Sequence, residues 1–228
     1  MCGIIGYTGS EDVKGVLLDA LELLEYRGYD SAGIALADTG LKQTKVYKCA
    51  GRVKDLRVIC ESEKLITECG IGHTRWATHG GVNDTNAHPH QVGKVTLVHN
   101  GIIENYRELI ADYELESVLK SETDSEVVAA LLNKFYTGDP DEAIKKTVSK
   151  LKGTFALVIL FEDHQGEIYS VRNVSPIVAT LCKEGAMLAS DLTALCRFTN
   201  RYFVVPEYHI LKLAKDAIVL KDFNGNQV

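Results

Sequence analysis

The sequence predicts an α+β fold in which two mainly antiparallel sheets are stacked and carry helices on their outer faces. Several strand-like segments come early in the chain, two helices lie near its middle, and a strand-rich half follows. The strands are not separated by the regular crossover helices of a doubly wound sheet. Only four prolines and no Ser/Gly-rich tract interrupt the 228 residues, so we expect a single domain over 1–228.

The first half of the chain mixes strands with helices. An apolar segment at 2–8 predicts a strand, and residues 12–26 repeat apolar side chains at helical spacing. Gly28 then suits a helix end. Two paired strands, a helix and two more strands around a polar stretch are expected at 32–37, 44–49, 53–62, 70–76 and 95–99.

The second half begins with helices and continues with strands. Thr123 and Glu126 have the spacing of a capping box, which predicts a helix through residue 135. A second helix is expected at 139–151. Apolar runs separated by turns then predict strands at 154–161, 167–171, 177–181, 187–190 and 210–219.

Composition excludes several classes of protein. Lys plus Arg is 25 and Asp plus Glu is 31, a net charge of −6, which argues against nucleic-acid binding. No stretch approaches the roughly 20 apolar residues of a membrane span, and no signal peptide is visible, so we expect no membrane association and a cytoplasmic location. The six cysteines form no C-x-x-C pair, so most of them suit small buried hydrophobes.

Cys2 differs from the other cysteines because of its position. Removal of Met1 would leave a thiol and a free α-amine on one residue. Their unperturbed pKa values are close, about 8.5 and about 7.7–8.0, so the amine can take the thiol proton near neutral pH. The alternative is an ordinary buried cysteine in a first strand.

Six motifs in register give Cys2 a context. Together they resemble the glutaminase domain of the glutamine–fructose-6-phosphate aminotransferase family, a class II glutamine amidotransferase domain of the N-terminal-nucleophile hydrolase type. The resemblance runs from Cys2 to about Arg201. The motifs are MCGIIGYTG at the start, EYRGYDSAG at 25–33, HTRWATHG at 73–80, NAHPH at 86–90, HNGIIENY at 99–106 and SETDSE at 121–126.

The resemblance implies a four-layer αββα sandwich and a catalytic role for three residues. Cys2 would be the nucleophile, and Asn100 with Gly101 would form the oxyanion hole. An amide side chain and a neighbouring backbone N–H suit a tetrahedral oxyanion, although Asn-Gly is also a common turn.

The resemblance also assigns the substrate grip. Arg75 would bind the glutamine α-carboxylate, Thr78 and His79 would line the same pocket, and Asp124 would bind the ammonium. The planar fork of arginine suits a carboxylate, while an acidic residue in a first helical turn is favoured by the helix dipole in any case.

Two further residues are expected to support the site. Arg27 would lie near Cys2, unless it only caps the first helix, and Trp76 would help to gate the passage of ammonia, unless it is plain core. The sequence departs from the family pattern at two turns. Gly81 and Val82 stand where a residue and then proline are usual, and Val174 stands where the family has glycine in an Arg-x-Gly-Ser-Pro turn.

The activity implied is hydrolysis of L-glutamine to glutamate and ammonia through a Cys2 thioester, with no metal or organic cofactor. The family enzyme continues into a sugar-phosphate isomerase domain that uses ammonia to make glucosamine-6-phosphate from fructose-6-phosphate. This chain ends at Val228, so we expect it to lack that partner domain and to make no amino sugar by itself.

Three alternatives stay open at this point. In the first, the chain is the glutaminase domain of another amidotransferase, although RGYDSAG and TRWATHG favour the fructose-6-phosphate family. In the second, it is a non-catalytic glutamine-binding domain, if Met1 is retained. In the third, it is a metal-dependent hydrolase built on the five histidines of 73–99, although no H-E-x-x-H pattern is present and hydrogen-bonding loop histidines fit better.

Overall fold

The computed structural model describes residues 2–62, 65–76 and 80–228. The helices are α1 (Val13–Leu24), α2 (Val53–Cys60), α3 (Tyr106–Tyr113), α4 (Asp124–Phe135) and α5 (Pro140–Val148). The strands are β1 (Gly3–Gly9), β2 (Ser31–Asp38), β3 (Gln43–Ala50), β4 (Thr67–Arg75), β5 (His90–Val92), β6 (Val95–Ile103), β7 (Gly153–Phe161), β8 (Ile168–Asn173), β9 (Val178–Cys182), β10 (Gly185–Ala189), β11 (Phe203–Val204), β12 (His209–Ala214) and β13 (Ala217–Asp222).

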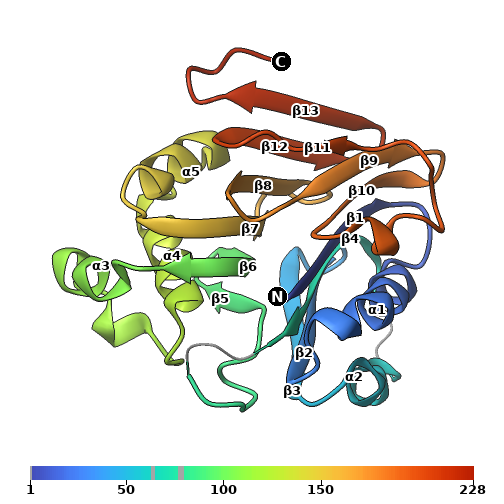
Figure 1. The fold of residues 1–228 in the computed structure, drawn as a ribbon, viewed down its shortest axis with the longest axis horizontal. Coiled ribbons are helices and arrows are strands. Elements are labelled where there is room, and N and C mark those ends of the chain that lie inside the picture. The colour runs from blue at the N-terminus through green and yellow to red at the C-terminus, as the bar shows by residue number, and fades with distance from the viewer. Residues whose placement is uncertain (1, 63–64, 77–79) are drawn as a thin grey trace.

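The strands form two antiparallel sheets. One has seven strands in the order β11-β9-β10-β1-β4-β2-β3, and the other has six in the order β13-β12-β8-β7-β6-β5. All the pairings between neighbouring strands are antiparallel. β1, where the chain begins, lies inside the first sheet between β10 and β4. Figure 1 shows the N-terminus near the centre of one face, beside the end of β6.

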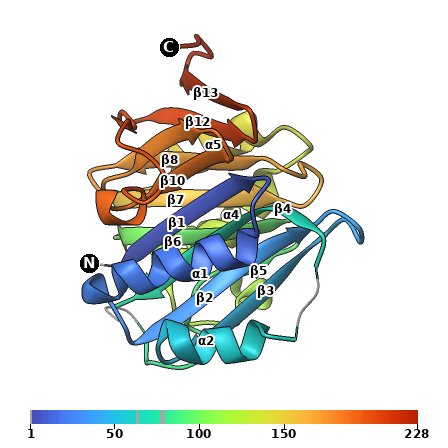
Figure 2. The same ribbon diagram turned by 90° about the vertical axis from the view of Figure 1, so that its right-hand side faces the viewer.

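Three hydrophobic clusters separate four layers. One joins α1 and α2 to the seven-stranded sheet, one joins α3, α4 and α5 to the six-stranded sheet, and the third lies between the sheets. Figure 2 shows α1 and α2 covering the outer face of their sheet. Neighbouring residues of one strand serve different clusters, as Ala156 faces the other sheet and Leu157 faces the helices. The predicted αββα sandwich is confirmed.

Local signals explain the two longest elements of the helical layer on the six-stranded sheet. Asp139 caps α5 by accepting from the Glu142 N–H at 3.3 Å, and Pro140 occupies the first turn. Thr123 caps α4 by accepting from the Glu126 N–H at 3.2 Å. The Glu126 carboxylate accepts instead from the backbone N–H groups of 120 and 121, so only half of the expected capping box forms.

The structure corrects one expected strand and adds three elements that were not expected. The segment expected as one strand at 210–219 is the β12–β13 hairpin, which turns at residues 215 and 216. The short strands β5 and β11 and the helix α3 were not predicted.

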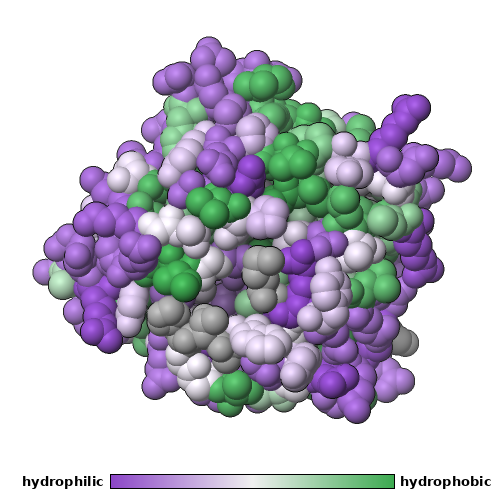
Figure 3. All heavy atoms as spheres, viewed as in Figure 1, coloured by the Kyte–Doolittle hydropathy of each residue, from purple (hydrophilic) through white to green (hydrophobic). Residues whose placement is uncertain are grey.

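Figure 3 shows the face that carries the N-terminus, where hydrophobic side chains lie around the middle and hydrophilic ones cover the margin over α3.

Candidate active site

The Cys2 thiol lies just before β1 and is held by the backbone of Trp76. The Trp76 N–H donates to Sγ at 3.2 Å, and Sγ lies 3.6 Å from the Trp76 carbonyl oxygen. Burial raises the pKa of the Cys2 thiol, against the opposing effects of the Trp76 N–H and the nearby Arg75 charge. The thiol therefore needs a base to become a nucleophile at neutral pH.

The edge of β6 next to Cys2 is open because β5 is short. β5 pairs with β6 only at residues 95–97, so among the described residues no strand pairs with the rest of that edge. In an antiparallel ladder alternate residues face the same edge, so Gly101 and Ile103 direct their N–H groups to this open side. The Ile103 N–H donates to Asp124 Oδ2 at 2.8 Å. The Gly101 N–H points to the same side.

Asn100 and Gly101 lie together beside Cys2, as the sequence predicted. Asn100 Nδ2 donates to the Cys2 carbonyl oxygen at 2.9 Å. Gly101 has a φ of +136°, and a Cβ there would lie 2.0 Å from the Thr154 carbonyl oxygen. Glycine is therefore required at this position, both for the backbone angle and for the contact with β7.

Arg75 and Asp124 line one narrow pocket with Cys2. Both side chains are buried, and Gly101 and His99 complete much of the wall. The volume is about 30 Å³, so any ligand much larger than a water molecule must move the walls apart. Arg75 ends β4 and reaches the carbonyl oxygens of Gly81 at 3.3 Å and Gly80 at 3.5 Å. A cation and an anion in one pocket with a thiol suit a zwitterionic ligand that carries an electrophilic group.

Thr78 and His79 lie outside the described residues. The segment that follows them is tied to the loop before α4 through Asn86. Its Nδ2 donates to the Gly81 carbonyl oxygen at 3.0 Å and to Glu122 Oε2 at 3.2 Å. The Glu122 N–H returns a bond to Asn86 Oδ1 at 3.0 Å.

A second hollow of about 400 Å³ lies on the other side of Cys2. Its lining is mostly apolar and includes both predicted supporting residues, Arg27 and Trp76. The Arg27 guanidinium pairs with Asp191 and donates from Nε to the Tyr26 hydroxyl at 3.1 Å. Trp76 is half exposed, and its ring lies edge-on to Tyr29 at 5.9 Å, so it is not plain core. Cys2 thus stands between a polar pocket and an apolar hollow.

Gly28 serves the site in a way that the sequence did not indicate. α1 ends at Leu24 and a short 3-10 turn follows, and Gly28 has an extended φ of −179° rather than the left-handed angle of a helix cap. A Cβ at Gly28 would lie 2.7 Å from the Arg75 carbonyl carbon and from the Trp76 nitrogen. Glycine therefore lets the turn after α1 pack against the backbone that holds Cys2.

Val174 keeps a glycine-like conformation. Its φ is +67°, in the left-handed region that a β-branched side chain rarely adopts. The side chain is 61% exposed and lines the apolar hollow beside Cys2. The turn therefore has, at the position where the family has glycine, the positive φ that glycine adopts most readily.

His73, His88 and His90 form a buried cluster rather than polar loop residues. The ring of His73 stacks on that of His88 at 4.1 Å, and His90 lies edge-on to His88 at 4.6 Å. Burial lowers the pKa of His73 to about 3 and holds the pKa values of His88 and His90 well below the usual range, so the cluster is neutral. Among the described residues, no three His, Cys, Asp or Glu side chains are grouped as a metal site requires.

Glycine makes room for this cluster, which sequence reasoning missed. Gly33 lies opposite His73 in the β2–β4 pairing. A Cβ at Gly33 would lie 2.1 Å from the His88 carbonyl oxygen. The signal present in the sequence was a histidine that follows the glycine-rich run Gly70-Ile71-Gly72 within a strand.

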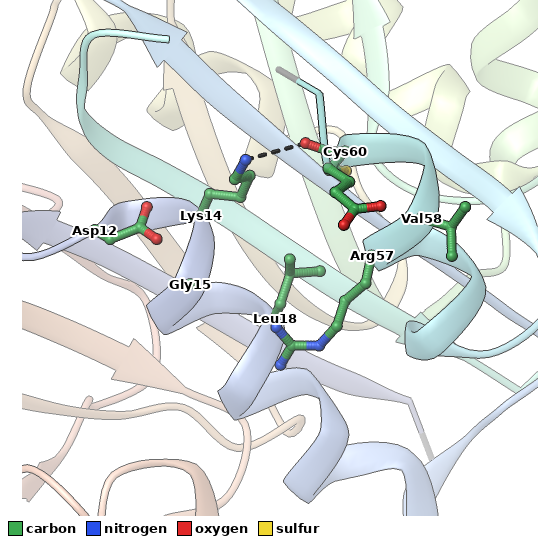
Figure 4. A pocket seen from close by; sticks show the side chains of 8 residues that line it. Asp12, Lys14, Gly15, Leu18, Arg57, Val58 and Cys60 are labelled. Atoms are coloured by element: carbon green, nitrogen blue, oxygen red, sulfur yellow. Dashed lines mark hydrogen bonds between the residues drawn. The ribbon is translucent and has the colours of Figure 1, made fainter. Parts of the chain in front are cut away.

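A further hollow lies between α1 and α2, away from these residues. Figure 4 shows Lys14 donating to the Cys60 carbonyl oxygen, at 3.0 Å, across this hollow. Arg57 pairs with Asp19 and Glu22. None of its lining residues borders either hollow at Cys2, so it is not part of the site.

An αββα sandwich whose first strand follows a half-buried cysteine defines the class of N-terminal-nucleophile amidotransferases, and the comparisons agree. A family model described as a glutamine amidotransferase domain matches residues 73–197, more than half of the chain. The chain belongs to this glutamine amidotransferase family. In the part of the chain that the structure describes, no helix is long and apolar enough to cross a membrane.

The similar curated proteins share one printed name. The chain is 42% identical over 232 residues to the glutamine–fructose-6-phosphate aminotransferase (isomerizing) of Bacillus subtilis strain 168 and 43% identical over 232 residues to that of Staphylococcus aureus strain N315. Each match covers 100% of this chain and 38% of the relative, so the chain spans well under half the length of these proteins.

Solved structures share the fold over nearly the whole chain. The glutamine phosphoribosylpyrophosphate amidotransferase of B. subtilis has a TM-score of 0.81 at 24% identity. A structure described as the allosteric regulatory enzyme of purine biosynthesis has a TM-score of 0.84 at 25% identity. In both cases the match covers 99% of this chain and 50% of the other.

Proposed function

We propose that this chain hydrolyses L-glutamine to L-glutamate and ammonia, with Cys2 as the nucleophile. The observation that carries the proposal is a single pocket lined by the Cys2 thiol, the Arg75 cation, the Asp124 carboxylate and the backbone of Gly101. A glutamine bound there can set its α-carboxylate on Arg75 and its α-ammonium on Asp124, which leaves the side-chain amide for the thiol.

The base in this proposal is the α-amine of Cys2 after removal of Met1. The amine accepts the thiol proton, and Sγ forms a bond to the amide carbon of glutamine. The carbonyl electron pair moves to oxygen and then returns as the amide nitrogen takes the proton from the α-ammonium and leaves as ammonia, which frees the amine again. A water then attacks the thioester carbon and gives a proton to the amine. The C–S bond breaks, glutamate leaves, and Sγ takes that proton to regenerate the thiol. Because burial raises the pKa of the Cys2 thiol, a base attached to the same residue is well suited.

The oxyanion in each step would be stabilised by Asn100 Nδ2 and the Gly101 N–H. Asn100 already directs Nδ2 at the Cys2 backbone, and Gly101 directs its N–H to the open edge of β6. Such preorganised donors supply a large share of catalysis in acyl transfer. Thr78 and His79 are proposed to line the carboxylate side of the pocket on the resemblance alone.

We also propose that the chain is one domain over 1–228 that supplies ammonia for glucosamine-6-phosphate synthesis from fructose-6-phosphate, with a sugar-phosphate isomerase domain as its partner. The names of the curated relatives support this assignment, as does the share of their length that the chain spans. No metal or organic cofactor is needed for this chemistry. A reducing, cytoplasmic setting suits the six free cysteines.

The proposal is tested with Cys2→Ala and Cys2→Ser in a glutaminase assay. Both variants should lose turnover while retaining the fold and glutamine binding, because only the thiol performs the covalent step. Cys196→Ala is the matched control, since Cys196 is exposed and borders neither hollow at Cys2. Intact mass should show that Met1 is missing from active protein. Substantial turnover by Cys2→Ala would contradict the assignment.

A further inference from the structure

His73 lies behind the proposed oxyanion hole and has no role in the chemistry described so far. It sits in β4 and is 1% exposed, and its ring reaches the open edge of β6. Its Nε2 lies 3.1 Å from the His99 carbonyl oxygen and 3.0 Å from Asn100 Oδ1. The ring plane is fixed by stacking on His88 at 4.1 Å.

The surroundings of His73 determine its tautomer. A backbone carbonyl oxygen can only accept a hydrogen bond, so Nε2, which faces the His99 carbonyl, must carry a proton. The other ring nitrogen, Nδ1, is buried and has no hydrogen-bond partner among the described residues, which suits an unprotonated atom. Burial lowers the pKa of His73 to about 3, so the ring is neutral with its proton on Nε2.

This tautomer in turn determines which way the Asn100 amide faces. If the amide turned over, its NH₂ group would face the Nε2–H of His73, and two donors would meet in a buried place. With Oδ1 toward His73, the NH₂ group faces Cys2, and one of its hydrogens bonds the Cys2 carbonyl oxygen at 2.9 Å. The same orientation directs the second hydrogen of the NH₂ group away from His73.

We propose that His73 is a positioning residue that holds the Asn100 amide with its NH₂ group toward Cys2 and so prepares the oxyanion hole. The inference rests on the proposed glutaminase function. A turned amide would present an oxygen to the developing oxyanion and oppose the reaction that it should assist. His73 acts only through Asn100 and does not touch the substrate.

The test is a double-mutant cycle that joins His73→Phe with Asn100→Ala. Phenylalanine keeps a ring to stack on His88 but has no donor. In the wild-type background, His73→Phe should lower kcat about tenfold, the effect of losing one neutral hydrogen bond, and should leave KM for glutamine within about twofold. In the Asn100→Ala background it should change kcat by less than about twofold, because no amide remains to orient.

Two additions keep the test decisive if His73→Phe folds poorly. His73→Gln places an amide N–H near the position of Nε2 and should restore most of kcat. The γ-aldehyde of glutamate, which adds the Cys2 thiol across its carbonyl and sets an oxygen in the hole, should bind about tenfold more weakly to His73→Phe. Binding of L-glutamate should not change.

The outcomes separate the two proposals. An equal loss of kcat in both backgrounds, or no loss in either, would overturn the role of His73. A loss that His73→Gln does not restore would also overturn it. Absence of glutaminase activity in the wild-type protein with Met1 removed would instead refute the proposed function.

Discussion

Replacing Asn100 by alanine separates the oxyanion hole from the substrate grip. The change removes the Nδ2 donor at Cys2, and the bond between Oδ1 and His73 with it. One oxyanion donor is worth roughly 2.7–4 kcal/mol in the transition state, so kcat should fall about 100-fold to 1000-fold. KM for glutamine should change little, because the contacts proposed for Arg75 and Asp124 are to the zwitterionic end of glutamine and not to its side-chain amide.

A matched variant is needed to separate the effect of Asn100→Ala on folding stability from its effect on kcat, and Asn105→Ala provides it. Asn105 is buried, whereas Asn100 is half-buried, and it too uses both ends of its amide, with Nδ2 donating to the Lys150 carbonyl oxygen at 2.9 Å and Oδ1 accepting from the Lys152 N–H at 2.9 Å. Each neutral bond contributes about 1 kcal/mol, so both variants should lose about 2 kcal/mol of folding stability. Only Asn100→Ala should lose kcat.

The assay is steady-state release of glutamate from glutamine, with unfolding followed by circular dichroism on the same samples. A rise in KM alone for Asn100→Ala would refute the oxyanion role. An equal loss of kcat in Asn105→Ala would show that the effect arises from weakened folding rather than from a lost donor.

Three further predictions concern substrate binding, acid stability and a strained turn. Arg75→Ala and Asp124→Ala should each raise KM for glutamine at least about tenfold, measured by steady-state kinetics. Stability measured by urea unfolding should fall as pH drops below about 6.5. Burial depresses the folded-state pKa values of His73, His88 and His90, so the unfolded chain binds more protons than the folded one. Each of these histidines therefore lowers the free energy of unfolding by up to about 1.4 kcal/mol per pH unit. Val174→Gly should raise the free energy of unfolding by about 1 kcal/mol, and the unfolding midpoint with it, because it relieves a positive φ at an exposed side chain.

Each of these predictions has a matched control. Arg57→Ala removes an arginine paired on the outer helices and should leave KM unchanged. His88→Phe should make the acid slope shallower, and an unchanged slope would show that the cluster is not its source. Val58 is 71% exposed in α2, so Val58→Gly should lower the midpoint, whereas a drop for Val174→Gly would argue against strain at that turn.

The sequence was sufficient for the layers of the fold because the apolar periods are long and clear. α1 repeats apolar residues along one face, and β7 is apolar throughout because both of its faces are buried. α3 was missed because only Leu109 among its eight residues is buried and Asn105 offers no side-chain cap. The β12–β13 turn was missed because residues 215 and 216 are Lys and Asp, without glycine or proline to mark it.

The candidate site divides in a similar way. Cys2, Arg75 and Asp124 were named from the sequence through the motifs and the family resemblance that they carry, and they lie together in one pocket. Glycines that act through close packing were not named. Gly28 and Gly33 matter because another backbone passes where a Cβ would lie, and no local pattern reveals a contact with residues more than 40 positions away.

The shortness of β5 has a consequence for protein engineering. Extending β5 toward the register of Gly101 would pair more of this edge of β6 with a strand and add hydrogen bonds to the sheet. Those bonds would consume the Gly101 N–H that is proposed to stabilise the oxyanion. Stability and chemistry compete here for the same backbone groups, so a design that ranks variants by sheet hydrogen bonding would select against activity.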